Sequence, residues 1–162
     1  MRDGCRYAVW PAWAILIIPL SVTLLLVTAA AAEDICGYPE KGTLVVHREE
    51  LTVGKFRVGL AENRDQHRKG LMGCRDLGPG TGLLFVYPDA QQRTFWMKDT
   101  PLTLAILFIS SSGRRAAIEE GEPFSTEHIR SPNSIQYVLE IHQTEVGAIQ
   151  VGDRITLQLT PE

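Results

Sequence analysis

The sequence predicts a mainly β fold, a compact sandwich- or barrel-like antiparallel sheet domain with one or two short helices. Short apolar or alternating segments recur along the chain and are bounded by Gly, Pro, Asn and Ser. Helical patterning is confined to a few short stretches. The sequence shows no internal repeat, so residues 43–162 are expected to form a single β-rich domain behind an N-terminal signal segment.

Residues 1–32 have the composition of a secretory signal peptide. Arg2 and Arg6 precede the uncharged stretch WAILIIPLSVTLLLVTAAAA, whose alanine-rich end suits cleavage before Glu33. The alternative is an uncleaved inner-membrane anchor through residues 7–32, because a bilayer span needs roughly 20 apolar residues. Either way the sequence predicts an exported protein, periplasmic or secreted.

The charge balance argues against nucleic acids as partners. The chain has 16 basic and 19 acidic residues, a net charge of −3, whereas nucleic-acid-binding domains are usually basic. The four histidines are scattered without the spacing of a metal site on one element, so no metal is predicted. No phosphate-binding or dinucleotide-binding glycine motif is present, so no cofactor is predicted.

The N-terminal part of the predicted domain begins irregularly. Residues 33–42, EDICGYPEKG, are rich in Gly, Pro and charge and are expected to form a lead-in without regular structure. A short strand is predicted at residues 43–47, TLVVH. In KFRVGLA, residues 55–61, Phe56 and Val58 share one face and charged residues the other, which indicates a half-buried strand.

A short helix is predicted over residues 64–70. Asn63, followed three residues later by Gln66, resembles a capping box at its start, and Gly70 is suited to its end. The segment DLGPGTG, residues 76–82, is expected to be a loop because of its Gly and Pro content.

Two later segments, LLFVY (83–87) and LAILFI (104–109), are apolar on both faces and are therefore expected to be central strands. The remaining segments are shorter or more polar. In chain order they are a weak strand (AAIEE, 116–120), a long loop (121–135), a strand (YVLEI, 137–141), one helical turn (HQTEVGA), a tight turn (VGD) and an alternating strand (RITLQL, 154–159).

Two of the three cysteines lie in the predicted mature chain, since Cys5 belongs to the signal segment. In an oxidising compartment we expect Cys36 and Cys74 to form a disulfide. The alternative is a pair of independent thiols.

The segment TFWMK, residues 94–98, carries the first candidate site. Strand alternation places Phe95 and Met97 in the core and Trp96 and Lys98 on the opposite face. A tryptophan can serve as a ligand platform, and a lysine beside it, followed by Asp99, can hold a polar or anionic group. The alternative is an edge aromatic that covers apolar surface together with a lysine stem.

Glu140 is the second candidate, because it is a carboxylate in the otherwise apolar strand YVLEI. If this strand lies near TFWMK, Glu140 could meet Lys98 or Arg93. Such a buried pair could do acid–base chemistry or be purely structural, since an ionised group in a core must be paired.

Several motifs together resemble the domain of unknown function 192 family. They are RKGLMGCRDL (68–77), GTGLLFVYPDAQQRTFWMKDTPLTLAILFI (80–109), YVLEI (137–141) and VGDRITL (151–157). The resemblance covers nearly the whole predicted mature chain, and it implies a compact β-rich, sandwich-like domain, often with a signal peptide. It implies no established activity.

The chain departs from the family pattern at three positions that follow TFWMK in the sequence. Asp99 stands where the family usually has Asn, Thr103 where it has Pro, and Ala105 where it has Asp. If the family's aspartate has a chemical role, this chain has lost it at position 105.

Three functions are compatible with the sequence. The leading hypothesis is an exported domain that binds a small polar or anionic ligand, or an envelope partner, through Trp96, Lys98, Asp99 and Glu140. The second is an enzyme that uses Lys98 with Asp99 or Glu140 as an acid–base pair. The third is a structural envelope module, which predicts an exposed apolar patch and no pocket.

Overall fold

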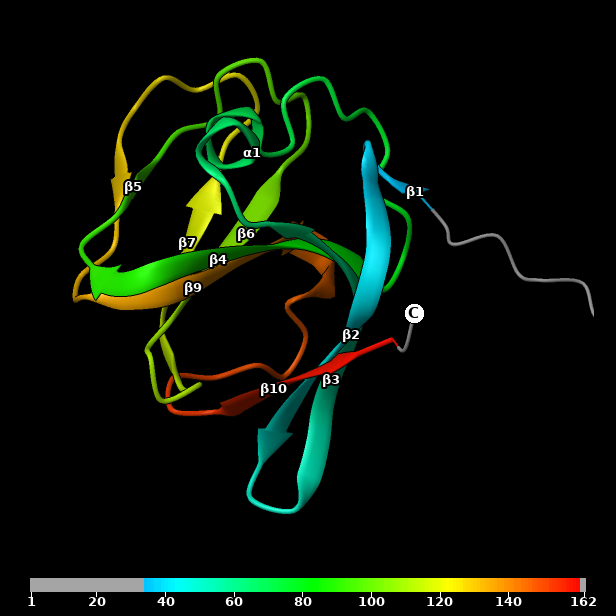
Figure 1. Ribbon diagram of the computed structural model, residues 1–162, viewed down its shortest axis with the longest axis vertical. Helices are drawn as coiled ribbons and strands as arrows, with labels where there is room; N and C mark the ends of the chain where they lie inside the picture. The colour runs from blue at the N-terminus through cyan, green and yellow to red at the C-terminus, as the bar shows by residue number, and fades with distance from the viewer. Residues whose placement is uncertain (1–33, 161–162) are drawn as a thin grey trace, which may run out of the picture. The chain divides into compact units, whose positions relative to one another are not determined.

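The computed structural model describes residues 34–160, drawn in colour in Figure 1. The predicted signal peptide or anchor, residues 1–32, lies outside this part of the chain. Within it, no helix has the length and apolar character needed to cross a bilayer.

Strands dominate the described residues, which confirms the predicted mainly β class. In chain order the elements are β1 (Asp34–Ile35), β2 (Tyr38–Arg48), β3 (Leu51–Ala61), α1 (Arg64–Lys69), β4 (Thr81–Gln91), β5 (Thr94–Phe95), β6 (Leu104–Ile109), β7 (Arg115–Gly121), β8 (Ile129–Arg130), β9 (Ile135–His142), the 3₁₀ helix η1 (Gln143–Glu145) and β10 (Arg154–Leu159).

The main sheet has the strand order β1-β2-β3-β4-β9-β6-β7, and β10 pairs with β2. All of its pairs are antiparallel except β3 with β4, which are parallel because α1 lies in the connection between them. The Ile155 amide donates a hydrogen bond to the Gly113 carbonyl at 2.7 Å. The Arg115 amide donates one to the Asp153 carbonyl at 2.9 Å. These bonds join the start of β7 to the start of β10, so the curled sheet closes on itself like a barrel.

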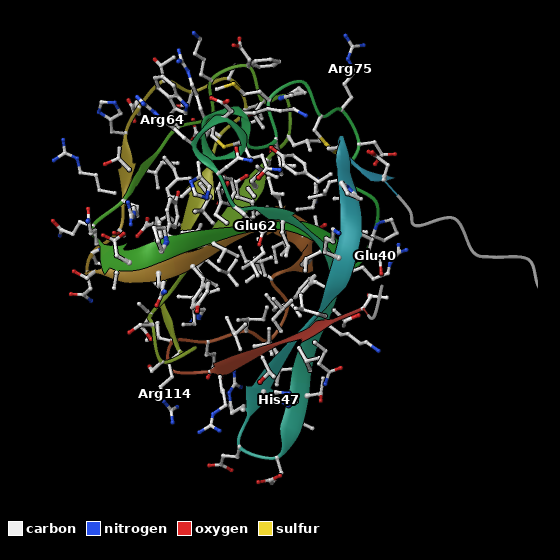
Figure 2. All side chains as sticks on the ribbon, viewed as in Figure 1. Glu40, His47, Glu62, Arg64, Arg75 and Arg114 are labelled. Carbon is white, nitrogen blue, oxygen red and sulfur yellow. A yellow bond between two sulfur atoms is a disulfide. The ribbon has the colours of Figure 1, made fainter. Side chains whose placement is uncertain are left out.

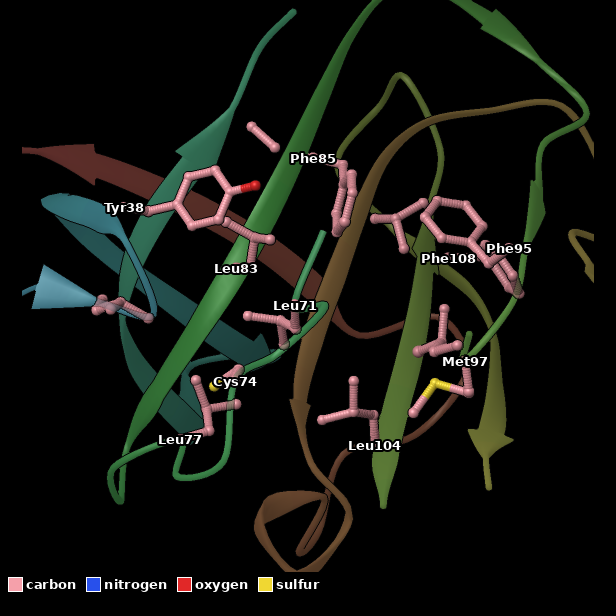
Figure 3. Close-up of a cluster of buried hydrophobic side chains, with 14 of the residues drawn as sticks. Tyr38, Leu71, Cys74, Leu77, Leu83, Phe85, Phe95, Met97, Leu104 and Phe108 are labelled. Atoms are coloured by element: carbon pink, nitrogen blue, oxygen red, sulfur yellow. The ribbon is translucent and has the colours of Figure 1, made fainter. Parts of the chain in front are cut away.

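Each face of the central strands packs into its own hydrophobic cluster. The first cluster lies under α1 and includes Phe85, Phe95, Met97 and Phe108 (Figure 3). The second lies on the other face, between the central strands and β10, and includes residues such as Leu139. Figure 1 shows α1 on one side of β4 and β9 and β10 on the other.

The predicted helix cap is confirmed. The Asn63 side chain accepts a hydrogen bond from the Gln66 amide at 3.0 Å, and the Gln66 side chain accepts one from the Asn63 amide at 3.2 Å. The helix ends at Lys69, because Gly70 has a φ of 47° and donates its amide to the Gln66 carbonyl.

The predicted irregular lead-in over residues 33–42 is wrong, because β1 and the first part of β2 occupy this segment. Tyr38 is only 2% exposed, and its hydroxyl donates to the Gly70 carbonyl at 3.2 Å. Tertiary burial and pairing with β3 thus override the local Gly and Pro signals.

The predicted disulfide between Cys36 and Cys74 is present, with the Cα atoms 5.4 Å apart. It ties the turn between β1 and β2 to the segment that follows α1. A disulfide of this kind is typical of proteins that work outside the reducing cytosol.

The surface carries most of the charge. Arg64, Arg75 and Arg114 are exposed and project outward from the ribbon (Figure 2).

Candidate functional site

The Trp96 corner begins where β5 ends. Only Thr94 and Phe95 are in a strand, paired with β8, so the predicted strand over residues 94–98 is shorter than expected. The predicted alternation nevertheless holds: Phe95 is 8% exposed, Met97 is 1% exposed and Trp96 is 42% exposed. The turn is held by a hydrogen bond from the Thr100 amide to the Met97 carbonyl, at 3.1 Å.

Two buried side chains anchor this corner to the sheet. The Phe95 ring meets Phe85 edge-on at 5.3 Å and Phe108 at 5.9 Å between centroids (Figure 3). Met97 packs so closely against Gly121 that a Cβ added there would lie 2.5 Å from its sulfur. The corner is therefore a packed element that presents Trp96 in a defined place.

Lys98 and Asp99 point away from the sheet interior. Lys98 is exposed, and its Nζ lies 5.9 Å from the centroid of the Trp96 ring. Asp99 has a φ of 57°, a left-handed conformation that Asn and Asp tolerate better than most residues. Its carbonyl accepts a hydrogen bond from the Gly73 amide at 2.8 Å, which joins the corner to the segment after α1.

A cavity of about 60 Å³ lies between the corner, α1 and the strands β4, β6 and β9. Its walls combine aromatic and apolar side chains with polar and cationic ones, and one acidic side chain is among the described residues that line it. The lining residues that the following argument uses are His67, Gly70, Tyr87, Phe95, Trp96 and Glu140. Trp96 and Glu140, both predicted from the sequence, thus meet at one cavity, whereas Lys98 and Asp99 do not line it.

Glu140 is placed in the cavity by the alternation of β9. Val138 packs in the first cluster and Leu139 and Ile141 in the second, so the Glu140 side chain lies on the face that α1 covers. A Cβ added at Gly70 would lie 3.8 Å from Glu140 Oε2, so the glycine backbone approaches this carboxyl group closely.

The Glu140 carboxyl group is buried without a polar partner. The residue is 4% exposed, and within the described part of the chain its side chain makes no hydrogen bond or ion pair. Burial disfavours the charged form and raises the pKa of Glu140 to about 8. At neutral pH the side chain is therefore mainly a neutral carboxylic acid, which can both donate and accept a hydrogen bond.

The predicted pairing of Glu140 with Lys98 or Arg93 is not formed. Strand β9 pairs with β4 and β6, whereas β5 pairs with β8, so TFWMK is not a sheet neighbour of YVLEI. Arg93 instead pairs with Asp89, with 2.6 Å between Nη2 and Oδ1, and lies over the Tyr87 ring.

Two aromatic residues near Glu140 were not identified as site residues from the sequence. His67 Nε2 lies 2.9 Å from the Ala61 carbonyl and 3.1 Å from the Val86 carbonyl, and its ring centroid is 4.2 Å from that of Tyr87. Burial raises the pKa of Tyr87 to about 12, so its hydroxyl remains protonated at neutral pH. Both residues form part of the cavity wall, and only the folding of α1 back onto β4 brings them there.

Ala105 lies on the opposite side of the sheet from this cavity. It is fully buried, pairs with Ile141 and belongs to the second cluster. An aspartate at this position would face the second cluster, so its absence leaves the Glu140 cavity unaltered.

Across residues 34–160, no group of three or more His, Cys, Asp or Glu side chains is arranged to hold a metal ion.

Comparisons with known proteins agree with the fold. A crystal structure from Sinorhizobium meliloti 1021, provisionally described as a transcription regulator, is 32% identical with a TM-score of 0.69, covering 74% of this chain and 95% of that chain. A protein of unknown function from Novosphingobium aromaticivorans DSM 12444 is 26% identical with a TM-score of 0.68, covering 78% of this chain and 91% of that chain. The comparison with curated proteins gives no match. The family model for domain of unknown function 192, described as uncharacterized ACR, matches residues 45–157. The chain belongs to the domain of unknown function 192 family.

Proposed function

We propose that this protein is a small-ligand-binding domain whose ligand inserts a polar group into the Glu140 cavity beside Trp96. The observation that carries the proposal is the buried Glu140 carboxyl group, which faces a cavity and has no polar partner among the described residues. Burying a polar group without a hydrogen bond costs roughly 1–3 kcal/mol in proteins. Because Glu140 keeps a small exposed fraction of 4%, a ligand that supplies the missing hydrogen bond recovers part of this free energy on binding.

The surroundings of the cavity favour binding of a small polar group. A volume of about 60 Å³ accommodates a few water molecules or one small functional group, since one water needs at least about 10–15 Å³ by this measure. Trp96 is partly exposed at the corner and offers an aromatic surface to the rest of the ligand.

The enzyme hypothesis has less support. Its lysine, Lys98, is exposed and lies against the Trp96 ring, away from the lining of the cavity. An acid–base pair of Lys98 with Glu140 would require the corner to rearrange.

The structural-module hypothesis predicts a continuous apolar patch. Among the described residues the large exposed apolar side chains are few: Leu51, Trp96, Phe124, Val151 and Leu159. The segments of Trp96 and Phe124 lie side by side, joined by the hydrogen bonds Met97 N–H to Ser125 O and Phe124 N–H to Thr100 O, both at 2.9 Å. This pair is the strongest support for the structural-module hypothesis. The description of the Sinorhizobium meliloti protein raises DNA binding as a further possibility, and the net charge of −3 argues against it.

We propose further that the protein works outside the cytosol, in the periplasm, as a secreted protein or anchored to the inner membrane. The disulfide between Cys36 and Cys74 and the hydrophobic N-terminal sequence support this location. Cell fractionation is expected to recover the protein outside the cytosol, and N-terminal sequencing should give Glu33 at its start if the signal peptide is cleaved and an upstream residue if the segment anchors the protein. Recovery in the cytosol with both thiols free would contradict the proposal.

The binding proposal can be tested by NMR with the full chain. The side-chain N–H signal of Trp96, assigned by its disappearance in Trp96→Phe, is followed during titration with small carboxylates, amides and amines. We expect at least one class to shift this signal saturably and Glu140→Met to abolish the shift. Exposed Glu119→Gln serves as the matched control and should leave the response intact. Equal responses in the wild type, Glu140→Met and Glu119→Gln, or no saturable shift with any probe, would overturn the proposal.

A further inference from the structure

Resting on the proposed function, we infer that the ligand group received by the Glu140 cavity is an oxygen hydrogen-bond acceptor, a carboxylate or a carbonyl, bound by the neutral carboxylic acid of Glu140. The inference narrows the ligand from any polar group to one chemical class. It excludes amines and other cationic groups as the preferred ligands of this cavity.

The charge pattern of the cavity lining is the first argument. Glu140 is the only acidic side chain among the described lining residues, whereas α1 contributes two cationic ones, Arg68 and Lys69. An incoming cation therefore meets like charge on this side of the cavity, and an incoming oxygen acceptor does not. Lys69 Nζ itself lies 4.9 Å from the centroid of the Tyr38 ring.

The surroundings of the carboxyl group are the second argument. Its neighbours across the sheet are Leu83 on β4 and Ile106 on β6, both apolar and fully buried. The titratable groups that face it from the elements packed on it are Tyr38 from β2, Tyr87 from β4 and the basic residues of α1. Burial raises the pKa of the carboxyl group and keeps it mainly neutral at pH 7, and no described side chain is bonded to it. A neutral acid donates its proton to an oxygen acceptor.

The size of the cavity is the third argument. About 60 Å³ suits a group of a few heavy atoms, such as a carboxylate or an amide carbonyl. The Tyr38 hydroxyl is already committed, because it donates to the Gln66 and Gly70 carbonyls at 3.2 Å each. Glu140 is therefore a nearly buried lining side chain that still has a hydrogen bond to offer a ligand.

The experiment compares three probes of similar size on the full chain: acetate, acetamide and methylammonium. Each is titrated at pH 7 and pH 9 while the Trp96 indole signal is recorded. The inference predicts that acetate binds and that its affinity falls about tenfold from pH 7 to pH 9, as Glu140 with a pKa of about 8 loses its proton. In Glu140→Gln, which cannot titrate, the ratio of the two affinities should be close to one.

The possible outcomes separate this inference from the binding proposal. Preferred binding of methylammonium that tightens as the pH rises would overturn the acceptor class and leave the cavity as a ligand site. Failure of all three probes to shift the Trp96 signal would overturn both. Acetate binding with the same pH dependence in Glu140→Gln would also overturn the inference, because the proton would then belong to another group.

Discussion

Replacing Glu140 with glutamine should stabilise the protein in a way that depends on pH. Burial raises the pKa of Glu140 from 4.5 to about 8, so the folded state holds a proton that the unfolded state releases above pH 4.5. Because the folded state binds more protons, stability falls as the pH rises from 4.5 to 8 and then levels off. The shift of about 3.5 units corresponds to about 5 kcal/mol at most, at 1.36 kcal/mol per unit. Glutamine is neutral at every pH and avoids this loss.

The assay is urea unfolding of the wild type and Glu140→Gln at pH 5, 6.5 and 8, with the disulfide intact. We expect similar free energies of unfolding at pH 5 and an advantage of several kcal/mol for Glu140→Gln at pH 8. Glu119→Gln removes an exposed carboxylate of β7 and controls for the change in net charge. If the difference between wild type and Glu140→Gln is the same at all three pH values, the buried neutral carboxyl group is refuted.

Three further predictions follow from the packing. Cys36→Ser should lower the free energy of unfolding by about 4 kcal/mol in the chain-entropy model, because the disulfide spans 38 residues. Reduction of the disulfide in the wild type should lower it by the same amount. An unchanged free energy of unfolding in both experiments would contradict a stabilising role of the disulfide. Met97→Ala should lower the free energy of unfolding by about 2–5 kcal/mol because Met97 is 1% exposed. Trp96→Ala should lower it clearly less in the same urea experiment. Equal decreases for the two variants would place Trp96 in the core. Asn63→Ala should cost about 1 kcal/mol through the lost helix cap, and an unchanged unfolding midpoint would contradict the capping role.

The elements best predicted from the sequence are those whose apolar pattern ends at clear turn residues. β6 and β10 were predicted at their observed bounds, because Ser110 follows the first and the VGD turn precedes the second. The capping box of α1 was predicted because it is a contact between residues three apart in the chain. Local physical rules are sufficient for features of this kind.

The candidate site was predicted only in part. Glu140 and Trp96 could be found because one is a carboxylate in an apolar strand and the other an aromatic residue on a polar face. That both side chains line one cavity could not be predicted, because the cavity exists only where α1 and the Trp96 corner pack over β4 and β9. The pairing of Glu140 with Lys98 was the natural electrostatic expectation, but the order of strands in the sheet, which depends on contacts distant in sequence, prevents it.

The side-chain carboxyl ¹³C signal of Glu140, followed from pH 4 to pH 10, tests most directly whether this carboxyl group is buried, neutral and free to receive a ligand. The signal can be assigned by its loss in Glu140→Gln. The structure predicts a titration midpoint of about 8, and bound acetate should move this midpoint higher because it binds the protonated form. A midpoint at the ordinary value for an exposed glutamate, with or without acetate, would contradict the account.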